Sequence, residues 1–322
     1  MRRLLMNLVL LTMVSCGHKP VSTTVQGEPG GQNPFLGEGL YVDGQSQAAI
    51  AANSASGENA PLIRMIAEQP QADWLGEWSG PIATTVNRYL SEAESEGKLR
   101  VMIAYNVPNR DCDQYSKGGL GDETDYLEWI DEMAEAIGHR KTVVILEPDT
   151  LGQLKMCLSE KDQEARLDML RKAIARLKRA PKTSVYLDAG NALWIEAEEM
   201  AKRLTAAGVS SADGFAINVS NYVATDKSIA YGEAISRALG GSVPFVVDTS
   251  RNGKGAISED DWCNPPGRGL GTAPTTETGH PLVHAFLWLK RPGESDGTCN
   301  DGPPAGAWYE AQALELARNA AL

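Results

Sequence analysis

The chain is poor in the residues from which metal sites and nucleic-acid surfaces are built. Its 322 residues include only 4 histidines, which lie too far apart in the sequence to suggest a metal cluster. Cys-x-x-Cys pairs and calcium-loop signatures are also absent. Acidic residues outnumber basic ones by 42 to 30, and the formal net charge of −12 repels phosphate backbones. The sequence therefore predicts no metal site and no nucleic-acid partner.

Long apolar runs are lacking as well, and the run near the N-terminus is too short to span a bilayer stably. Arg2 and Arg3 precede this mainly apolar run, Leu4–Val14, which leads into a lipobox-like Val14-Ser15-Cys16. We expect residues 1–16 to be a lipoprotein signal peptide and Cys16 to become the lipidated first residue of the mature chain. Cleavage as an ordinary signal peptide, without lipid, is the alternative.

Residues 17–33 are rich in Gly, Pro, Ser, Thr and Gln, and we expect them to form a flexible tether. The remaining residues, 34–322, would then form one catalytic domain, because a single α/β barrel often exceeds the usual domain size. Gly17 follows Cys16 at the position where an Asp would favour the inner membrane. We therefore expect an exported monomer that is held at the outer membrane by its lipid.

Cysteine is also scarce, with 5 in the chain. Export would bring the cysteines beyond Cys16 into an oxidising compartment, where thiols pair. Cys112, Cys157, Cys263 and Cys299 permit three pairings. We favour Cys112 with Cys157 and Cys263 with Cys299, because each bond would close a loop of moderate size and hold it rigid.

Aromatic residues make up only 6% of the chain, yet the 7 Trp outnumber the 4 Phe. A surplus of Trp is typical of sugar-binding sites, because the flat apolar face of a pyranose packs on an indole ring. Filling the hydrophobic core is the alternative use of these residues.

Short β-branched runs alternate with amphipathic helical stretches beyond the tether, which indicates βα units and a parallel sheet. The expected strands span 100–105, 142–146, 184–187, 215–217, 244–247 and 285–289, and the expected helices span 123–137, 161–180, 195–207, 227–239 and about 307–321. Polar side chains follow these strands, among them Asp111, Asp149, Asp188, Asn218, Asp248 and Lys290. Because the ends of parallel strands share one edge, we expect these side chains to gather there.

Several carboxylates in one cleft predict acid–base chemistry on an uncharged substrate, because like charges held close together cannot all ionise. One carboxyl then keeps its proton near neutral pH and can protonate a leaving oxygen, as glycoside hydrolysis requires. Binding of Ca²⁺ or Mg²⁺ is the alternative, although Asp111, Asp149 and Asp188 follow separate strands. Gly293–Gly297 matches the nucleophile elbow of serine hydrolases, but no helix follows at once and no histidine lies downstream.

A series of longer motifs resembles the family 6 glycoside hydrolases, which are cellulases. The motifs are Tyr105–Cys112, Glu147–Asp149, Tyr186–Gly190, Asn218–Tyr222, Asp248–Gly253, Trp262-Cys263 and Leu287–Gly297. They stand in the family's order, and the resemblance covers roughly residues 34 to 321. It implies an α/β fold, a distorted TIM-like (β/α) barrel with about seven parallel strands. It also implies the two favoured disulfides and inverting hydrolysis of β-1,4-glucans without a cofactor.

The resemblance assigns roles to individual residues. Asp149 matches the general acid, and Asp111 would raise the pKa of Asp149 and help to relay the proton from the attacking water. Asp296 matches a proposed base, and Tyr105 matches the residue that crowds the distorted sugar at the cleavage point. Implied substrate-binding residues are the platforms Trp74, Trp194 and Trp262 and the polar side chains Asp188, Asn218, Lys290 and Glu294.

The close spacing of the later motifs leaves little room for the long loops that roof the tunnel of exo-acting relatives. We therefore expect an open cleft and endo-acting hydrolysis of cellulose or soluble β-glucan. A cellobiohydrolase of the same family is one alternative. A glucan-binding lipoprotein without catalysis is another.

Overall fold

The computed structural model describes residues 33–258 and 260–321. The predicted signal peptide, the lipidation site Cys16 and the tether up to residue 32 lie outside these ranges. Within the described ranges, no helix is long and apolar enough to cross a membrane.

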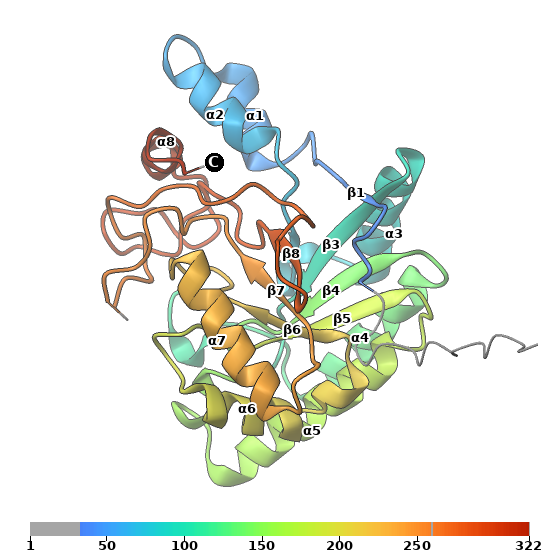
Figure 1. Cartoon of the computed structure of the whole chain (residues 1–322). Coiled ribbons are helices and arrows are strands. Elements are labelled where there is room, and N and C mark those ends of the chain that lie inside the picture. The colour runs from blue at the N-terminus through green and yellow to red at the C-terminus, as the bar shows by residue number, and fades with distance from the viewer. Residues whose placement is uncertain (1–32, 259, 322) are drawn as a thin grey trace, which may run out of the picture.

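A curled parallel sheet forms the centre of the fold (Figure 1). Its main path runs in the order β1-β3-β4-β5-β6-β7-β8, β2 also pairs with β3, and every described ladder is parallel. The strands are β1 (Gly39–Leu40), β2 (Asp73–Leu75), β3 (Lys98–Ala104), β4 (Thr142–Leu146), β5 (Thr183–Asp188), β6 (Gly214–Ile217), β7 (Phe245–Asp248) and β8 (Val283–Leu287). This arrangement confirms the predicted distorted barrel.

Most helices pack against the outer face of the sheet (Figure 1), where they bury the larger hydrophobic cluster. A second cluster, formed by side chains such as Val101, Ile145 and Ala216, fills the inside of the barrel. The α-helices are α1 (Gln47–Ser54), α2 (Asn59–Ala67), α3 (Ile82–Ser95), α4 (Glu123–Ile137), α5 (Glu160–Leu177), α6 (Ala197–Ala206), α7 (Thr225–Ala238) and α8 (Glu310–Arg318). Short 3₁₀ turns are η1 (Glu77–Ser79), η2 (Asp111–Asp113), η3 (Gln153–Lys155) and η4 (Val209–Ser211).

The last strand ends two residues earlier than the apolar run 285–289 predicts. Beyond Leu287 the chain leaves the ladder because the carboxylate of Asp248 accepts the N–H groups of Leu289 and Lys290, at 3.3 and 2.9 Å. The apolar side chain of Leu289 is nevertheless fully buried. Hydrophobic pattern alone cannot separate a paired residue from a buried one that follows the strand.

The barrel is closed between β2 and β8 by side chains as well as by backbone. Among the described residues no ladder joins these strands, but the N–H of Ala72 donates to the carbonyl of Trp288 at 3.0 Å. The indole N–H of Trp74 donates to the carbonyl of Leu289 at 2.9 Å. The guanidinium of Arg291 also binds the carbonyl of Ala72, at 2.8 Å. Trp74 is thus fixed at the seam of the barrel.

Asp73 holds two arginine side chains at this seam. Its carboxylate is 1% exposed and pairs with both Arg100 and Arg291. Replacing Asp73 by Ala leaves two guanidinium groups in the interior without this partner, so we expect the free energy of unfolding to fall by about 3–5 kcal/mol. Chemical denaturation measures this loss. Lys141→Ala removes a partly exposed pair with Glu38 and serves as the control, with an expected change below about 1 kcal/mol.

Candidate active site

A groove of about 1030 Å³ crosses the end of the barrel at which the strands terminate. Loops that follow β2, β3, β4, β5, β6, β7 and β8 all contribute to its walls. It contains most of the residues that the sequence predicts for the site: Trp74, Tyr105, Asp111, Asp149, Trp194, Trp262, Lys290, Glu294 and Asp296. The expectation that side chains far apart in the sequence gather at one edge is therefore met.

Left-handed backbone conformations are concentrated at this end of the barrel. Asp111 has a φ of 61°, Glu147 of 52° and Asp149 of 66°. Such values are uncommon for residues other than glycine, and they persist only where the surroundings hold them in place. The two loops that carry Asp111 and Asp149 are hereafter the β3 loop (residues 105–118) and the β4 loop (residues 147–158).

Asp149 is half-buried at the bottom of the groove. Burial raises the pKa of its carboxyl well above the usual range. The negative charges of Asp188, Asp111 and Asp296 raise this pKa further, and the nearby Tyr105 hydroxyl only partly opposes the shift. Asp149 therefore keeps its proton to a higher pH than an ordinary aspartate does.

Asp111 is held by two hydrogen bonds, one to each carboxylate oxygen. Oδ1 accepts from the side-chain amide of Gln153 at 2.8 Å, and Oδ2 accepts from the N–H of Ser116 at 2.8 Å. Burial raises the pKa of Asp111, whereas these two donors lower it. Because Gln153 belongs to the β4 loop, its bond joins the two loops directly.

Two further contacts between the β3 and β4 loops are buried and were not predicted. Glu147 accepts the N–H of Asn106 at 2.9 Å. Arg166, on α5, donates to the hydroxyl of Thr150 at 3.3 Å and also contacts the carbonyl of Pro108. Arg166 lies on the buried face of α5, in line with Leu170 and Ile174, and its guanidinium reaches both loops.

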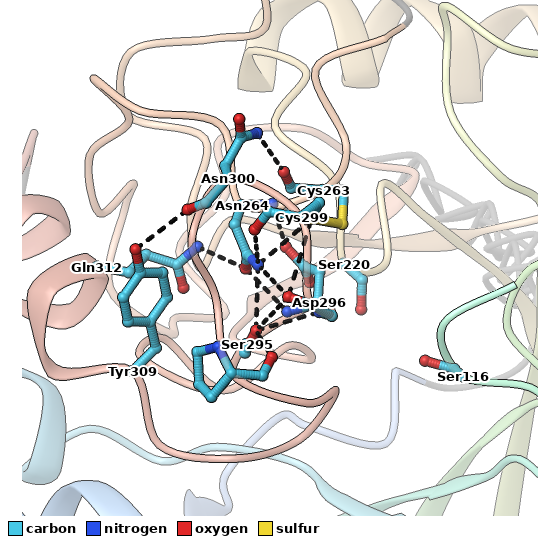
Figure 2. The surroundings of a disulfide bond; sticks show 12 residues. Ser116, Ser220, Cys263, Asn264, Ser295, Asp296, Cys299, Asn300, Tyr309 and Gln312 are labelled. Atoms are coloured by element: carbon cyan, nitrogen blue, oxygen red, sulfur yellow. Dashed lines mark hydrogen bonds between the residues drawn. A yellow bond between two sulfur atoms is a disulfide. The ribbon is translucent and has the colours of Figure 1, made fainter.

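The disulfides have the pairing that the sequence favours. Cys112–Cys157 links the β3 loop to the β4 loop, and Cys263–Cys299 lies beside Asp296 on the opposite side of the groove (Figure 2). Near the second bond, the side-chain amide of Asn264 donates to the carbonyl of Gly297 at 2.8 Å. Covalent and hydrogen-bonded links thus fix the loops on both sides of the groove.

Asp296 is surrounded by cationic and hydrogen-bonding groups. Its Oδ2 pairs with Arg251 at 2.7 Å and accepts from the N–H of Asn264 at 3.0 Å, while Oδ1 lies 3.4 Å from the ammonium of Lys290. Burial alone would raise the pKa of Asp296, but the charges of Arg251 and Lys290 outweigh it and lower the pKa. Asp296 is therefore ionised under conditions in which Asp149 is protonated.

Asp188 lies behind Asp149 and does not line the groove. Its Oδ2 accepts the N–H groups of Asp149 and Gly190, at 2.9 and 3.1 Å. Burial raises the pKa of Asp188 to about 7, although these backbone donors favour its anion. The structure places Asp188 as a support for the backbone of Asp149, and its predicted role in substrate binding near the acid stays a prediction.

Asn218 also lies outside the groove and is fully buried. Its side-chain amide donates to the carbonyl of Asp248 at 2.8 Å, and its side-chain oxygen accepts the N–H of Val223 at 3.1 Å. The polar atoms of Asn218 brace the loop after β6, so the structure does not bring this residue to the groove wall, and its contact with substrate stays a prediction.

The remaining predicted binding residues do face the groove. The ring of Trp194 lies so close to Gly152 that a Cβ there would come within 2.4 Å of it. Trp262 is 38% exposed and its ring centroid lies 6.0 Å from that of Tyr115. Glu294 accepts from the side-chain amide of Gln47 at 2.9 Å. These residues offer flat apolar faces and polar atoms, the combination that sugars require.

The described residues contain no group of three or more His, Cys, Asp or Glu side chains that could hold a metal ion. Among the carboxyl groups that line the groove, Asp149 has a raised pKa and Asp296 a lowered pKa. Two carboxyl groups whose environments separate their pKa values in this way can serve as an acid and a base.

The sequence matches the glycosyl hydrolases family 6 over residues 35–320. Endoglucanase A of Cellulomonas fimi is 44% identical over 284 residues, which cover 88% of this chain and 61% of that protein. Endoglucanase 1 of Streptomyces halstedii is 44% identical over 82% of this chain and 83% of its own length. The chain thus spans less than two thirds of the first of these relatives.

Solved structures show the same fold. The endoglucanase Cel6 of Mycobacterium tuberculosis, solved with a thio-linked cellobioside, has a TM-score of 0.86 and 44% identity, and the match covers 89% of this chain and 99% of that one. The cellobiohydrolase Cel6A core domain of Chaetomium thermophilum has a TM-score of 0.79 and 28% identity, with coverage of 90% and 99%. With the family match across most of the chain, these similarities show that the protein belongs to family 6 of the glycosyl hydrolases.

Proposed function

We propose that the protein is an endo-acting, inverting β-1,4-glucanase that cleaves cellulose or soluble β-glucan. The observation that carries this proposal is the opposite shift of two carboxyl pKa values in one groove, raised for Asp149 and lowered for Asp296. A glycosidic bond needs an acid for the leaving oxygen and an ionised group that accepts a proton from water. The groove supplies both without a cofactor.

In the proposed reaction, Asp149 donates its proton to the glycosidic oxygen as the bond to the anomeric carbon breaks. Water attacks that carbon from the opposite face, and its proton passes to a carboxylate, with Asp296 as the base and Asp111 as a relay. Tyr105 crowds the sugar at the cleavage point. The product then carries the inverted, α configuration, because only one displacement occurs.

Three tryptophans and two charged side chains are proposed to hold the glucan. Trp74, Trp194 and Trp262 would stack on glucosyl rings, while Lys290 and Glu294 would bind hydroxyl groups. Each of the five lines the groove.

Endo action is favoured over exo action by the similarity to relatives. Two proteins named endoglucanase are 44% identical to this chain, whereas proteins named as probable cellobiohydrolases are 29% identical. A cellobiohydrolase is the second candidate within the family. A binding protein without activity fits less well, because Asp111, Asp149 and Asp296, to which the family resemblance assigns catalytic roles, are present and line the groove.

Hydrolysis of cellohexaose, with the product anomers resolved by NMR, tests the reaction and its stereochemistry together. We expect α anomers at the new reducing ends and cleavage within the chain, and we expect carboxymethylcellulose to lose viscosity rapidly. Release of β anomers would contradict the inverting mechanism. Release of cellobiose only, with viscosity retained, would indicate the exo-acting alternative.

We also propose that residues 34–322 form the catalytic domain and that Cys16 carries a lipid that anchors it at the outer membrane after export. The support is the sequence alone: a basic start, a short apolar run and the lipobox-like Val14-Ser15-Cys16. A flexible tether would let the domain reach a polysaccharide from the membrane surface.

A further inference from the structure

The groove continues beyond Trp74 toward the first turns of α3. Its wall there is formed by Trp78, Ser79, Thr85, Arg88 and Tyr89, which have no role in the reaction proposed above. Trp78 stands out because its side chain is 54% exposed, although it belongs to η1, next to the buried seam of the barrel. An exposed indole in the wall of a groove is a candidate contact for ligand.

Trp78 is held in place from below by a buried cation. The guanidinium of Arg110 lies 4.8 Å from the centre of the indole ring, and Arg110 is only 4% exposed. Glu77 fixes this guanidinium with two bonds, at 2.6 and 2.9 Å, and the carbonyl of Tyr105 accepts a third at 2.9 Å. A ring on such a rigid base loses little conformational entropy when it binds a ligand.

Gly76 allows the indole to lie flat on this base. A Cβ at Gly76 would come within 2.4 Å of the Trp78 ring, so any larger residue would displace it. The orientation of Trp78 is therefore determined by its neighbours, even though much of the ring is exposed.

A continuous stack joins Trp78 to the centre of the groove. Arg110 lies 4.8 Å from the ring of Tyr105 as well as from that of Trp78, and Tyr105 contacts Trp74 edge-on with 5.1 Å between ring centroids. A glucan that occupies Trp74 and extends toward α3 would therefore meet Trp78 next.

We propose that Trp78 is the platform of an additional subsite, which binds a glucosyl unit of the glucan beyond the unit on Trp74. This proposal rests on the proposed function for the identity of the ligand. The occupant is a neutral pyranose, because the free part of the indole offers an apolar surface. The nearby polar side chains are already engaged, since Thr85 donates to the carbonyl of Ser79 at 2.8 Å and Arg88 pairs with Glu92 at 3.2 Å.

A different role for Trp78 would be to shield the Arg110–Glu77 pair from water. The two roles predict that the effect of losing Trp78 depends differently on the length of the glucan substrate. A platform affects only substrates long enough to reach it, whereas a shield that positions Tyr105 affects substrates of every length.

The experiment compares kcat/KM for cellohexaose and cellotriose in the wild type, Trp78→Ala and Trp78→Phe. For Trp78→Ala we expect the hexaose-to-triose ratio to fall about tenfold, because one stacking contact is lost only for the longer chain. Trp78→Phe keeps an aromatic face and should recover part of the ratio. If kcat/KM falls equally for both substrates, Trp78 acts as a shield and the proposed platform is overturned. If kcat/KM changes for neither substrate, the platform is overturned as well. Leu36→Ala, at an exposed apolar residue outside the groove, is the matched control.

Calorimetric binding of cellohexaose to proteins that carry Asp149→Ala separates this proposal from the proposed function. Addition of Trp78→Ala should weaken hexaose binding about tenfold and leave triose binding unchanged. If the wild type hydrolyses no glucan but this loss of affinity is found, the reaction is wrong and the platform is supported. If the affinity does not change, the platform is overturned whatever the activity of the wild type.

Discussion

Replacing Asp149 by Ala is expected to lower kcat on cellohexaose by about 10²–10⁴-fold, the range that general acid catalysis contributes. Burial and three neighbouring carboxylates raise the pKa of this side chain, so it is the group in the groove that can deliver a proton to the leaving oxygen. Binding of cellohexaose should change little, because the platforms and hydroxyl-binding groups remain. Steady-state kinetics and calorimetry measure the two quantities.

A substrate with an activated leaving group sharpens this experiment. A dinitrophenyl cello-oligosaccharide releases a stable phenolate, so its bond breaks without protonation, and Asp149→Ala should lose much less activity on it than on cellohexaose. Asp168→Ala removes an exposed carboxylate on α5 and is the control. An equal loss on both substrates would assign Asp149 a role other than that of the acid. Full activity of Asp149→Ala on cellohexaose would rule it out altogether.

The sequence predicted the groove well because each βα unit ends at the same edge of a parallel sheet. Asp111, Asp149 and Asp296 follow different strands, and the parallel topology alone brings them to the same groove. The same rule does not bring Asn218 to the groove wall, because a polar residue after a strand can equally well satisfy backbone groups of its own loop. A position directly after a strand predicts that the residue lies at this edge of the sheet. It does not predict whether the side chain points into the groove.

Two other features could not be found from sequence patterns. Arg166 lies on the buried face of α5, in line with Leu170 and Ile174, and only the structure shows that its guanidinium contacts two loops distant in sequence. Trp78 falls outside the motifs that carry the family resemblance, and its position depends on Gly76 below the ring and on Arg110, which is distant in sequence. Contacts of this kind arise from tertiary structure, which hydrophobic periodicity does not encode.

The pH dependence of the reaction is expected to change when Asp111 is replaced by Asn. The enzyme is active with Asp149 protonated and Asp296 ionised, so activity falls at high pH as Asp149 loses its proton and at low pH as Asp296 gains one. The charge of Asp111 raises the pKa of Asp149. Its removal therefore lowers that pKa, and we expect the alkaline limb of the kcat profile to move to lower pH.

The acid limb provides an internal control for this shift, because Arg251 and Lys290 hold down the pKa of Asp296 and neither is changed by the substitution. Asp113→Asn is the matched variant, since Asp113 is an exposed carboxylate two residues away with the same left-handed backbone. It should leave both limbs in place. A shift of the alkaline limb to higher pH in Asp111→Asn, or an equal shift in Asp113→Asn, would contradict the role of Asp111.

With the charge removed and the loop intact, kcat at the optimum should also fall about tenfold, because a carboxylate that could relay the proton from water is gone.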